Sequence, residues 1–286
     1  MEDINKVFGN GKTDIIVLYS GGKDSTYSLI KLKESGLFNM HALTFDNGFI
    51  KEEAKENIKK FTSGLKITHH FFVPDQELFY KALSICYKNF ANDDEYLPYF
   101  KRNGVFCWPC FSFLYDSAYE YASFHHINYI FGGWNPGQIA VGKHSTLYAG
   151  QIPFHEVYSV YVRTFMKFLN SNAMNLDCFT KNIEPEMQIV PYFCFEKYDR
   201  RRILDFIKEK GWSEPGRCES CTSNCNLNTP DRILYRKQFG YDRYELQIQK
   251  MIENGCAAAG EKELVHREVL DQDMADIILQ RIMEYI

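Results

Sequence analysis

The chain has 286 residues, of which 45% are hydrophobic and 24% charged, as in a globular protein with a large core. Its formal net charge of −4 gives no global positive field that would attract a nucleic acid. The sequence shows no N-terminal apolar segment of signal-peptide type and no run of roughly 18 apolar residues, so we expect a cytoplasmic protein without a membrane span.

An apolar run, a glycine turn and a helix follow one another near the start of the chain. Ile15 to Tyr19 is rich in β-branched residues and has no polar break, which is typical of a strand buried on both faces. The turn SGGKDS covers residues 20–25. Apolar residues then recur at helical spacing until Gly36, which suits a left-handed helix end. The segment therefore predicts a strand, a turn and a helix in immediate succession.

The turn has the residue types of an anion site. Its glycines let backbone N–H groups point outward, toward the positive end of the new helix. The lysine adds a charge, the serines add hydroxyl donors, and the aspartate can hold Mg²⁺ against a polyphosphate. The residues concerned are Ser20, Gly21, Gly22, Lys23, Asp24 and Ser25.

Strands and helices alternate along the next part of the chain. Further strands are predicted over Met40 to Phe45, Ile67 to Val73, Tyr129 to Gly133 and Met187 to Tyr192. Helices are predicted over 51–64, Asp75 to Phe90, Phe111 to His125, 157–170 and 198–210, with a loop over Asn92 to Gly104. The pattern predicts an α/β fold with a parallel sheet and helices on both faces, spanning residues 1–212. Residues 213–286 are predicted to form a small cysteine-containing helical appendage at the C-terminus.

Ligands of such sheets bind beyond the carboxyl ends of the strands, where the turn and two other segments would meet. The second strand ends at Thr44, Phe45 and Asp46, next to an Asn-Gly pair that is equally typical of a plain turn. Gly132 and Gly133 allow a ligand to approach the backbone closely, but a tight turn explains them equally well.

Nine cysteines in such a chain suggest thiols, metal ligands or catalytic groups rather than disulfides. Cys107 and Cys110 form a C-x-x-C pair at the expected start of a helix, which is too few ligands to fill a metal shell. Cys194 follows the last predicted strand and so belongs on the same rim. Cys218, Cys221 and Cys225 have a compact C-x2-C-x3-C spacing that suits zinc or an iron–sulfur cluster.

The hexamer SGGKDS in its strand–turn–helix context resembles the PP-loop of the ATP pyrophosphatases. Those enzymes cleave ATP between its α and β phosphates and form an adenylate on a substrate oxygen. The resemblance implies ATP on the turn, Mg²⁺ on Asp24, and Lys23 and Asp24 as catalytic residues. It also favours Thr44, Phe45, Asp46 and the Gly132–Gly133 pair as residues beside the nucleotide.

The order of hexamer, C-x-x-C and one late cysteine resembles the PP-loop tRNA thiolases of the two-thiocytidine type. In that family three cysteines hold a [4Fe–4S] cluster that presents sulfur to the adenylated base. The resemblance implies Cys107, Cys110 and Cys194 as ligands and as part of the catalytic site. The alternative is a structural zinc shared by Cys107, Cys110 and later cysteines, with Cys194 a buried thiol.

A second resemblance covers residues 14 to 268 approximately and concerns the N-acetyl sugar amidotransferases of surface-polysaccharide synthesis. It rests on SGGKDSTY, TFDNGF, NGVFCWPC, GGWNP and KQFGYDRYELQIQKMIENG. It implies ammonia from a separate glutaminase as the nucleophile and an N-acetyl sugar or nucleotide sugar as the acceptor. That family carries a cysteine-bearing segment before its loop, which this chain lacks, and its pattern requires neither Cys194 nor the cysteines of 218–225.

The function we expect is ATP-dependent adenylation of a carbonyl or amide oxygen, followed by transfer of sulfur from a cluster-bound sulfide. Amide transfer is the first alternative, and a non-catalytic nucleotide-binding subunit is the second. The acceptor is expected to be a small molecule or nucleotide rather than tRNA, with a sulfur donor or a glutaminase as partner. Homodimerisation is left open. The 218–225 cysteines form a separate structural site or complete the Cys107–Cys110 pair.

Overall fold

A computed structural model describes residues 4–9, 11–138, 150–176, 179, 182–215 and 224–285. These residues include six strands in one sheet of order β3-β2-β1-β4-β6-β5. The strands are β1 (Thr13–Leu18), β2 (Phe38–Phe45), β3 (Thr68–Phe72), β4 (Tyr129–Gly132), β5 (Ile152–Pro153) and β6 (Gln188–Pro191). All described neighbours pair in parallel except β5, which lies antiparallel at one edge.

The central strand β1 is buried on both faces. Ile15, Ile16 and Val17 have no exposed surface. Ile15 and Val17 belong to the core on one face of the sheet, and Ile16 and Leu18 to the core on the other face. The continuous apolar run is explained by this position, because both sides of the strand contact a helix layer.

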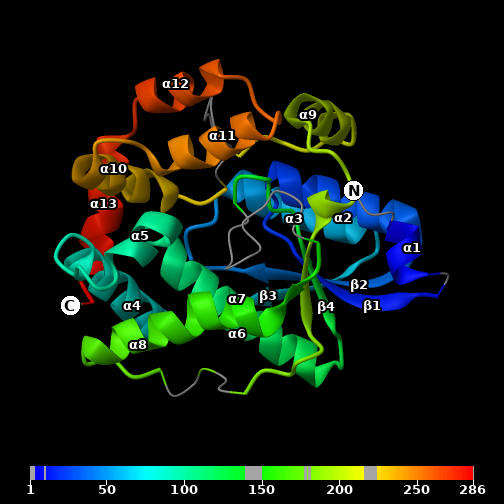
Figure 1. Cartoon of the computed structure of the whole chain (residues 1–286), viewed down its shortest axis with the longest axis horizontal. Helices are drawn as coiled ribbons and strands as arrows, with labels where there is room; N and C mark the ends of the chain where they lie inside the picture. The colour runs from blue at the N-terminus through cyan, green and yellow to red at the C-terminus, as the bar shows by residue number, and fades with distance from the viewer. Residues whose placement is uncertain are drawn as a thin grey trace.

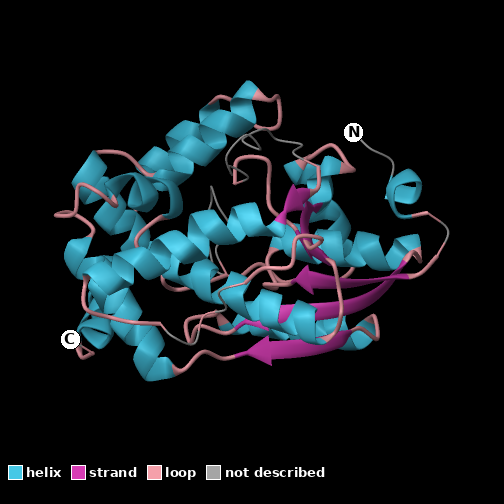
Figure 2. Cartoon of the chain, turned by 60° about the horizontal axis from the view of Figure 1, so that its bottom comes forward, coloured by secondary structure: helices cyan, strands magenta, loops and turns pink. Residues whose placement is uncertain are grey.

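Helices cover both faces, as the sequence predicts (Figures 1 and 2). The layer that packs on Ile15 and Val17 contains α2 (Lys23–Ser35), α3 (Glu52–Gly64), α9 (Arg200–Glu209) and the short α1 (Ile4–Phe8). The layer on Ile16 contains α4 (Gln76–Asn89), α5 (Leu97–Asn103), α6 (Cys107–Phe124), α7 (Phe154–Tyr158), the π-helix η1 (Ser159–Arg163) and α8 (Thr164–Ser171). The α/β fold with a mostly parallel sheet is therefore confirmed.

The polar segment Asn92 to Gly104 is not the loop that its composition predicts. It contains α5, whose Phe100 is fully buried in the core. Gly104 ends the helix with φ of 84°, a backbone conformation that favours glycine. The next helix, α6, begins at Cys107 rather than at the predicted Phe111, so the C-x-x-C pair occupies its first turn. Burial of Phe100 stabilises a helix in a segment whose polar composition alone predicts a loop.

The C-terminal helices pack directly on the α/β unit, at the upper left of Figure 1. They are α10 (Asn228–Phe239), α11 (Arg243–Glu253), α12 (Gly260–Arg267) and α13 (Gln272–Met283). The backbone of Asn224 accepts a bond from Lys51 (3.0 Å), and Asn226 donates one to Phe49 (2.8 Å). Helix α13 also packs against α4. In the part of the chain that is described, no helix has the length and apolar character needed to cross a membrane.

Candidate functional site

A pocket with a volume of about 360 Å³ lies beyond the carboxyl ends of the parallel strands. Leu18 of β1, Phe45 of β2, Gly132 of β4 and Pro191 of β6 all line it. This is where parallel sheets bind ligands. The turn over residues 20–25 lines it too, at the start of α2.

Gly21 shapes the turn. Its φ is 71°, and a Cβ at this position would lie 2.3 Å from the carbonyl oxygen of Ala54 in α3. No other residue fits both the conformation and the space. The turn can therefore lie close against α3 and direct its backbone toward the pocket.

Side chains from three distant segments bind the carbonyl groups of the turn. Asn224 Nδ2 donates to the carbonyl of Ser20 (2.6 Å). Trp212 Nε1 donates to the carbonyl of Gly21 (2.9 Å), and Asn57 Nδ2 donates to the same oxygen (3.3 Å). These bonds fix the backbone of the turn at the start of α2. The first N–H groups of a helix have no acceptor within the helix. Neither Asn57, Trp212 nor Asn224 carries a motif, so only the folded chain identifies them.

Lys23 and Asp24 meet at the buried hydroxyl group of Tyr198. Lys23 Nζ donates to Tyr198 Oη (2.8 Å), and Tyr198 Oη donates to Asp24 Oδ1 (3.2 Å). Lys23 and Asp24 also form an ion pair. Burial, and then the charge of Asp24, raise the pKa of Tyr198 well above its ordinary value. Tyr198 therefore stays protonated and holds the two predicted catalytic side chains in place, a role that the sequence did not indicate.

Two of the three residues predicted beside the nucleotide at the end of β2 line the pocket. Thr44 and Phe45 line the pocket, but Asp46 is not among the described residues that do. Asp46 Oδ1 instead accepts a bond from the N–H of Gly48 (3.0 Å), as in a local turn. The hydroxyl of Thr44 donates to the carbonyl of Tyr19 (2.6 Å), so this side chain joins two strands. The prediction of Asp46 beside the nucleotide is thus not supported, and the plain Asn-Gly turn accounts for it.

Gly132 and Gly133 line the pocket as predicted. A Cβ on Gly133 would lie 2.6 Å from the carbonyl oxygen of Asp24, and one on Gly132 would lie 2.3 Å from the ring of Trp134. These two positions therefore require glycine because the backbone lies close to Asp24 and to Trp134 of the protein itself.

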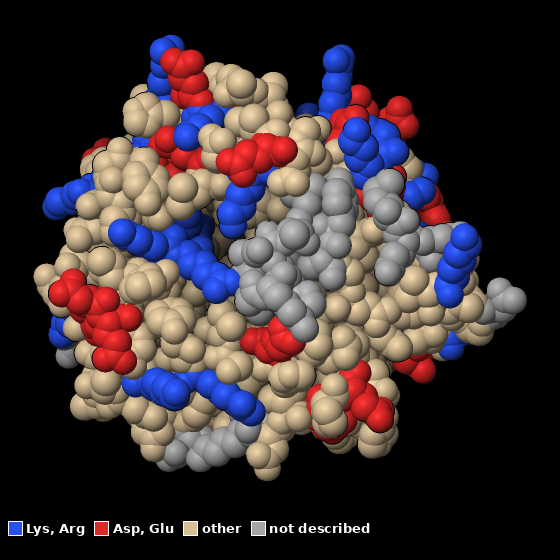
Figure 3. Space-filling model, in the orientation of Figure 1, with Lys and Arg blue, Asp and Glu red and all other residues tan. Residues whose placement is uncertain are grey.

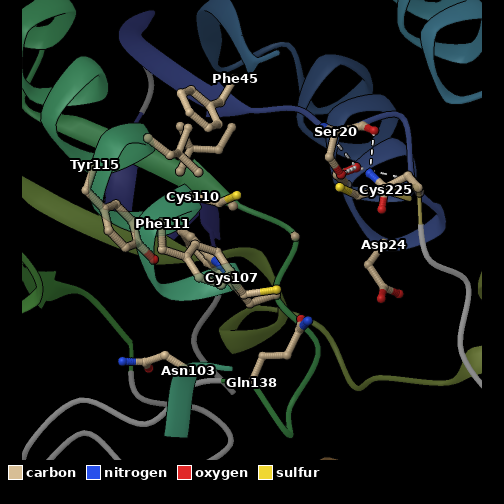
Figure 4. Close-up of a pocket in the computed structure, with 18 of the residues that line it drawn as sticks. Ser20, Asp24, Phe45, Asn103, Cys107, Cys110, Phe111, Tyr115, Gln138 and Cys225 are labelled. Carbon is tan, nitrogen blue, oxygen red and sulfur yellow. Dashed lines mark hydrogen bonds between the residues drawn. The ribbon is translucent and has the colours of Figure 1, made fainter. Parts of the chain in front are cut away.

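Within the described residues, three cysteines line the pocket beside the turn, namely Cys107, Cys110 and Cys225 (Figure 4). Asn47 Nδ2 donates to the sulfur of Cys110 and to that of Cys225, each at 3.4 Å. The two sulfurs therefore lie within twice that distance of each other. Cys218 and Cys221 lie outside the described residues.

Cys194 is not brought to this group. It is 3% exposed and packs in the core with α2 and α9, on the opposite face of the sheet from the layer that contains α6. It belongs to a 3₁₀ turn, η2 (Tyr192–Cys194), that follows β6 and directs the side chain into that core. Among the described cysteines it is Cys225, and not Cys194, that lines the pocket with Cys107 and Cys110. This agrees with the alternative in which the cysteines of 218–225 complete the pair, and the ligand role of these thiols stays a prediction.

Burial raises the pKa of all three thiols, that of Cys225 to about 11. Arg243 opposes the rise at Cys107, because its Nη2 donates to the Cys107 sulfur at 3.3 Å. Asp231 holds Arg243 by an ion pair (3.4 Å) and accepts the N–H of Phe106 (2.8 Å) just before α6. The first turn of α6 is thereby fixed from α10 and α11. Across the described ranges, no three His, Cys, Asp or Glu side chains are already arranged around a single ion.

The fold and the pocket together define an α/β protein in which the turn over residues 20–25 and, within the described residues, three thiols lie at one edge of a mostly parallel sheet. No family model and no curated protein sequence matches the chain. Among solved structures, the U34-tRNA thiolase NcsA from Methanococcus maripaludis with its [4Fe–4S] cluster is similar over 99% of this chain and 76% of its own, with 16% identity and a TM-score of 0.43. NMN synthetase from Francisella tularensis is similar over 98% and 89%, with 12% identity and a TM-score of 0.39. A predicted subunit of tRNA methyltransferase from Methanocaldococcus jannaschii is similar over 69% and 76%, with 18% identity and a TM-score of 0.35. These likenesses are distant, so the chemistry of the pocket has to follow from its own residues.

Proposed function

We propose that this protein binds ATP on the turn over residues 20–25 and uses it to adenylate an oxygen atom of an acceptor. The observation that carries this proposal is the anchoring of the turn. Its carbonyls are bound by Asn57, Trp212 and Asn224, which fixes the turn at a pocket that Lys23 and Asp24 also line.

In the proposed reaction the acceptor oxygen attacks the α-phosphorus of ATP, and the bond from that phosphorus to the α–β bridging oxygen breaks. Pyrophosphate leaves, and AMP is joined to the acceptor. The N–H groups of the turn and Lys23 neutralise charge on the phosphates as it shifts to pyrophosphate. Asp24 is the carboxylate of the turn and would hold Mg²⁺ against the phosphates. A nucleophile then displaces AMP, and catalysis consists mainly of positioning and charge neutralisation.

We further propose sulfur as the transferred atom, because three thiols stand beside the turn. Cys107, Cys110 and Cys225 would hold a [4Fe–4S] cluster, with Arg243 and Asn47 as hydrogen-bond donors to their sulfurs. When bound, such a cluster supplies sulfur chemistry, since three protein thiolates leave one iron without a protein ligand.

The reaction type is tested by the products of ATP. Protein incubated with Mg²⁺, labelled ATP, sulfide and fractionated small-molecule acceptors should form AMP and pyrophosphate in equal amounts, and a sulfur-containing product. ADP and phosphate as the products would refute adenylation. Equal AMP and pyrophosphate with ammonia but not with sulfide would keep adenylation and make the protein an amidotransferase that works with a separate glutaminase.

A further inference from the structure

One face of α6 continues the pocket beyond the thiols. The helix lines the pocket at positions i, i+3, i+4, i+7 and i+8, namely Cys107, Cys110, Phe111, Leu114 and Tyr115. At a rise of about 1.5 Å per residue, Tyr115 lies roughly 12 Å along the helix from Cys107. In Figure 4, Cys107 and Cys110 lie between Ser20 of the turn and Tyr115. A molecule that reaches from the turn past the thiols would therefore meet Tyr115.

Three aromatic rings group together at this end of the pocket, and we call them the aromatic trio. Phe111 and Tyr115 belong to α6, Tyr161 belongs to the π-helix η1, and all three line the pocket. The ring centroids are 5.2 Å apart for Tyr115 and Tyr161, 5.7 Å for Phe111 and Tyr161, and 5.9 Å for Phe111 and Tyr115. The carbonyl of Tyr161 accepts bonds from Trp108 Nε1 (3.1 Å) and Ser112 Oγ (3.0 Å), which fix η1 on α6. Short π-helical segments of this kind are frequent at functional sites.

Both tyrosines of the trio carry a hydroxyl group without a partner. Tyr115 is 4% and Tyr161 9% exposed, yet neither hydroxyl has a hydrogen-bond partner among the described residues. Neither is sealed from the pocket, because the described atoms that lack both a partner and accessible surface do not include them. Figure 4 shows the hydroxyl of Tyr115 pointing into the pocket. By contrast, the hydroxyl of Tyr119, one turn further along α6, donates to the carbonyl of Asn182 (2.7 Å).

These free hydroxyl groups are donors for a ligand. Burial raises the pKa of Tyr115 and of Tyr161, so both keep their protons. A hydroxyl group in so buried a position nearly always has a partner, and a hydroxyl that instead faces a pocket indicates an acceptor atom on the bound molecule.

Charged side chains line other parts of the pocket. In the part of the chain that is described, α6, α7 and η1 contribute only cysteine, aromatic and aliphatic side chains to it. The charged lining residues are Lys23 and Asp24 of the turn, Arg102 of α5 and Arg243 of α11. Figure 3 shows Lys and Arg side chains grouped beside a hollow between α5 and α11. The surface beyond the thiols therefore offers ring contacts and hydroxyl donors rather than ion pairs.

We propose that the aromatic trio is a subsite for an aromatic ring of the acceptor, with Tyr115 and Tyr161 as hydrogen-bond donors to oxygen or nitrogen atoms on that ring or its substituents. This rests on the proposed function, since it assigns the substrate class of the same pocket. Aromatic rings attract one another in offset and edge-to-face arrangements, as the members of the trio already do. A few polar groups in an otherwise apolar surface fix the orientation of a ligand. The acceptor is thus an aromatic small molecule rather than a saturated sugar.

The test uses the full chain with its turn first saturated by the non-cleavable analogue α,β-methylene-ATP. Benzamide, a ring with an acceptor oxygen, and benzene, a ring without one, are titrated separately by ligand-observed NMR. We expect Tyr115→Phe and Tyr161→Phe each to weaken benzamide binding about threefold to tenfold, as loss of one hydrogen bond does. Benzene binding should be unchanged, because the rings of the trio remain. Tyr119→Phe removes a hydroxyl from the same helix outside the pocket and should bind both probes as the unmodified protein does.

Each other result decides a separate point. No binding of benzamide, or equal binding by the unmodified protein and both variants of the trio, would overturn the subsite. Weaker binding of benzene as well as benzamide by these variants would show an altered pocket and overturn the role of the hydroxyls.

The kind of ring is tested with cyclohexanecarboxamide, which carries the same amide group on a saturated ring. It should bind at least about threefold more weakly than benzamide, since it lacks the aromatic contact. Equal or tighter binding, or displacement of benzamide by N-acetylglucosamine, would replace the aromatic ring by a saturated one. Failure of the nucleotide analogue to bind would count against the proposed function, while benzamide titrated without nucleotide would still decide on the subsite.

Discussion

Tyr198 joins the two charged groups of the turn through one hydroxyl group. Tyr198→Phe keeps the ring in its core but removes the acceptor of Lys23 and the donor to Asp24. We expect a loss of about 1 kcal/mol of stability and a roughly threefold to tenfold weaker affinity for MgATP. Isothermal titration and urea unfolding measure the two effects. An unchanged affinity would show that the hydroxyl does not position Lys23.

Asp24 in the first turn of α2 and Asp46 just after β2 offer a matched pair of carboxylates. Asp24 lines the pocket, whereas Asp46 is engaged in its own turn. We expect Asp24→Ala to reduce pyrophosphate release by more than 100-fold, since about 2.7 kcal/mol of lost transition-state stabilisation suffices. Asp46→Ala should stay within about threefold of the unmodified protein, a change of less than 1 kcal/mol. Equal effects of the two substitutions would remove Asp24 from its proposed role.

At the scale of elements, the turn between β1 and α2 needs a glycine at position 21 for two reasons, its positive φ and the lack of space for a Cβ. Gly36, at the other end of α2, shares only the first of these. Gly21 and Gly36 both have φ of 71°, but a Cβ would strike the carbonyl of Ala54 at Gly21 and meets nothing within 4 Å at Gly36. Gly36→Ala should cost about 1 kcal/mol and leave ATP binding intact. Gly21→Ala should cost more and also abolish ATP binding, because the turn has to move. Thermal unfolding and nucleotide titration distinguish the two, and equal ATP binding by both variants would contradict the account.

The junction of α5 and α6 depends on a buried ion pair. Asp231 accepts the N–H of Phe106 and pairs with Arg243, and neither side chain is more than slightly exposed. Removing one partner leaves the other charge buried, so Asp231→Ala should lower stability by about 3–5 kcal/mol. The double variant with Arg243→Met should recover part of the loss. Urea unfolding of the three variants checks this, and a double variant less stable than Asp231→Ala would refute the pairing.

The sequence predicts the β1–turn–α2 unit well because its signals are local. The apolar run, the glycines and the left-handed helix end all act within residues 14–36. No local signal of this kind shows that Cys225, and not Cys194, lies beside Cys107 and Cys110. Its place depends on an isolated bridge with Ile50 and on backbone bonds from the segment that follows β2. Tyr198, Asn57 and Trp212 were missed for the same reason, since their partners lie far away in the chain.

At the scale of the whole molecule, the C-terminal segment forms part of the pocket. Asn224 anchors the turn, and Cys225, Arg243 and Gln247 line the pocket. A chain cut after residue 212 should therefore not bind ATP, and its exposed apolar surfaces on α4 should make it aggregate. Size-exclusion chromatography and nucleotide titration test this. A monomeric, ATP-binding fragment would establish residues 1–212 as an independent domain.

Anaerobic purification followed by visible absorption and metal analysis tests the central claim most directly. The unmodified protein and Cys194→Ala should be brown and contain about four irons per chain, as a [4Fe–4S] cluster requires. Cys225→Ser should be colourless and still bind ATP, because its fold and its turn are unchanged. A colourless unmodified protein that contains stoichiometric zinc, or a brown protein that loses its colour with Cys194→Ala and keeps it with Cys225→Ser, would contradict the account.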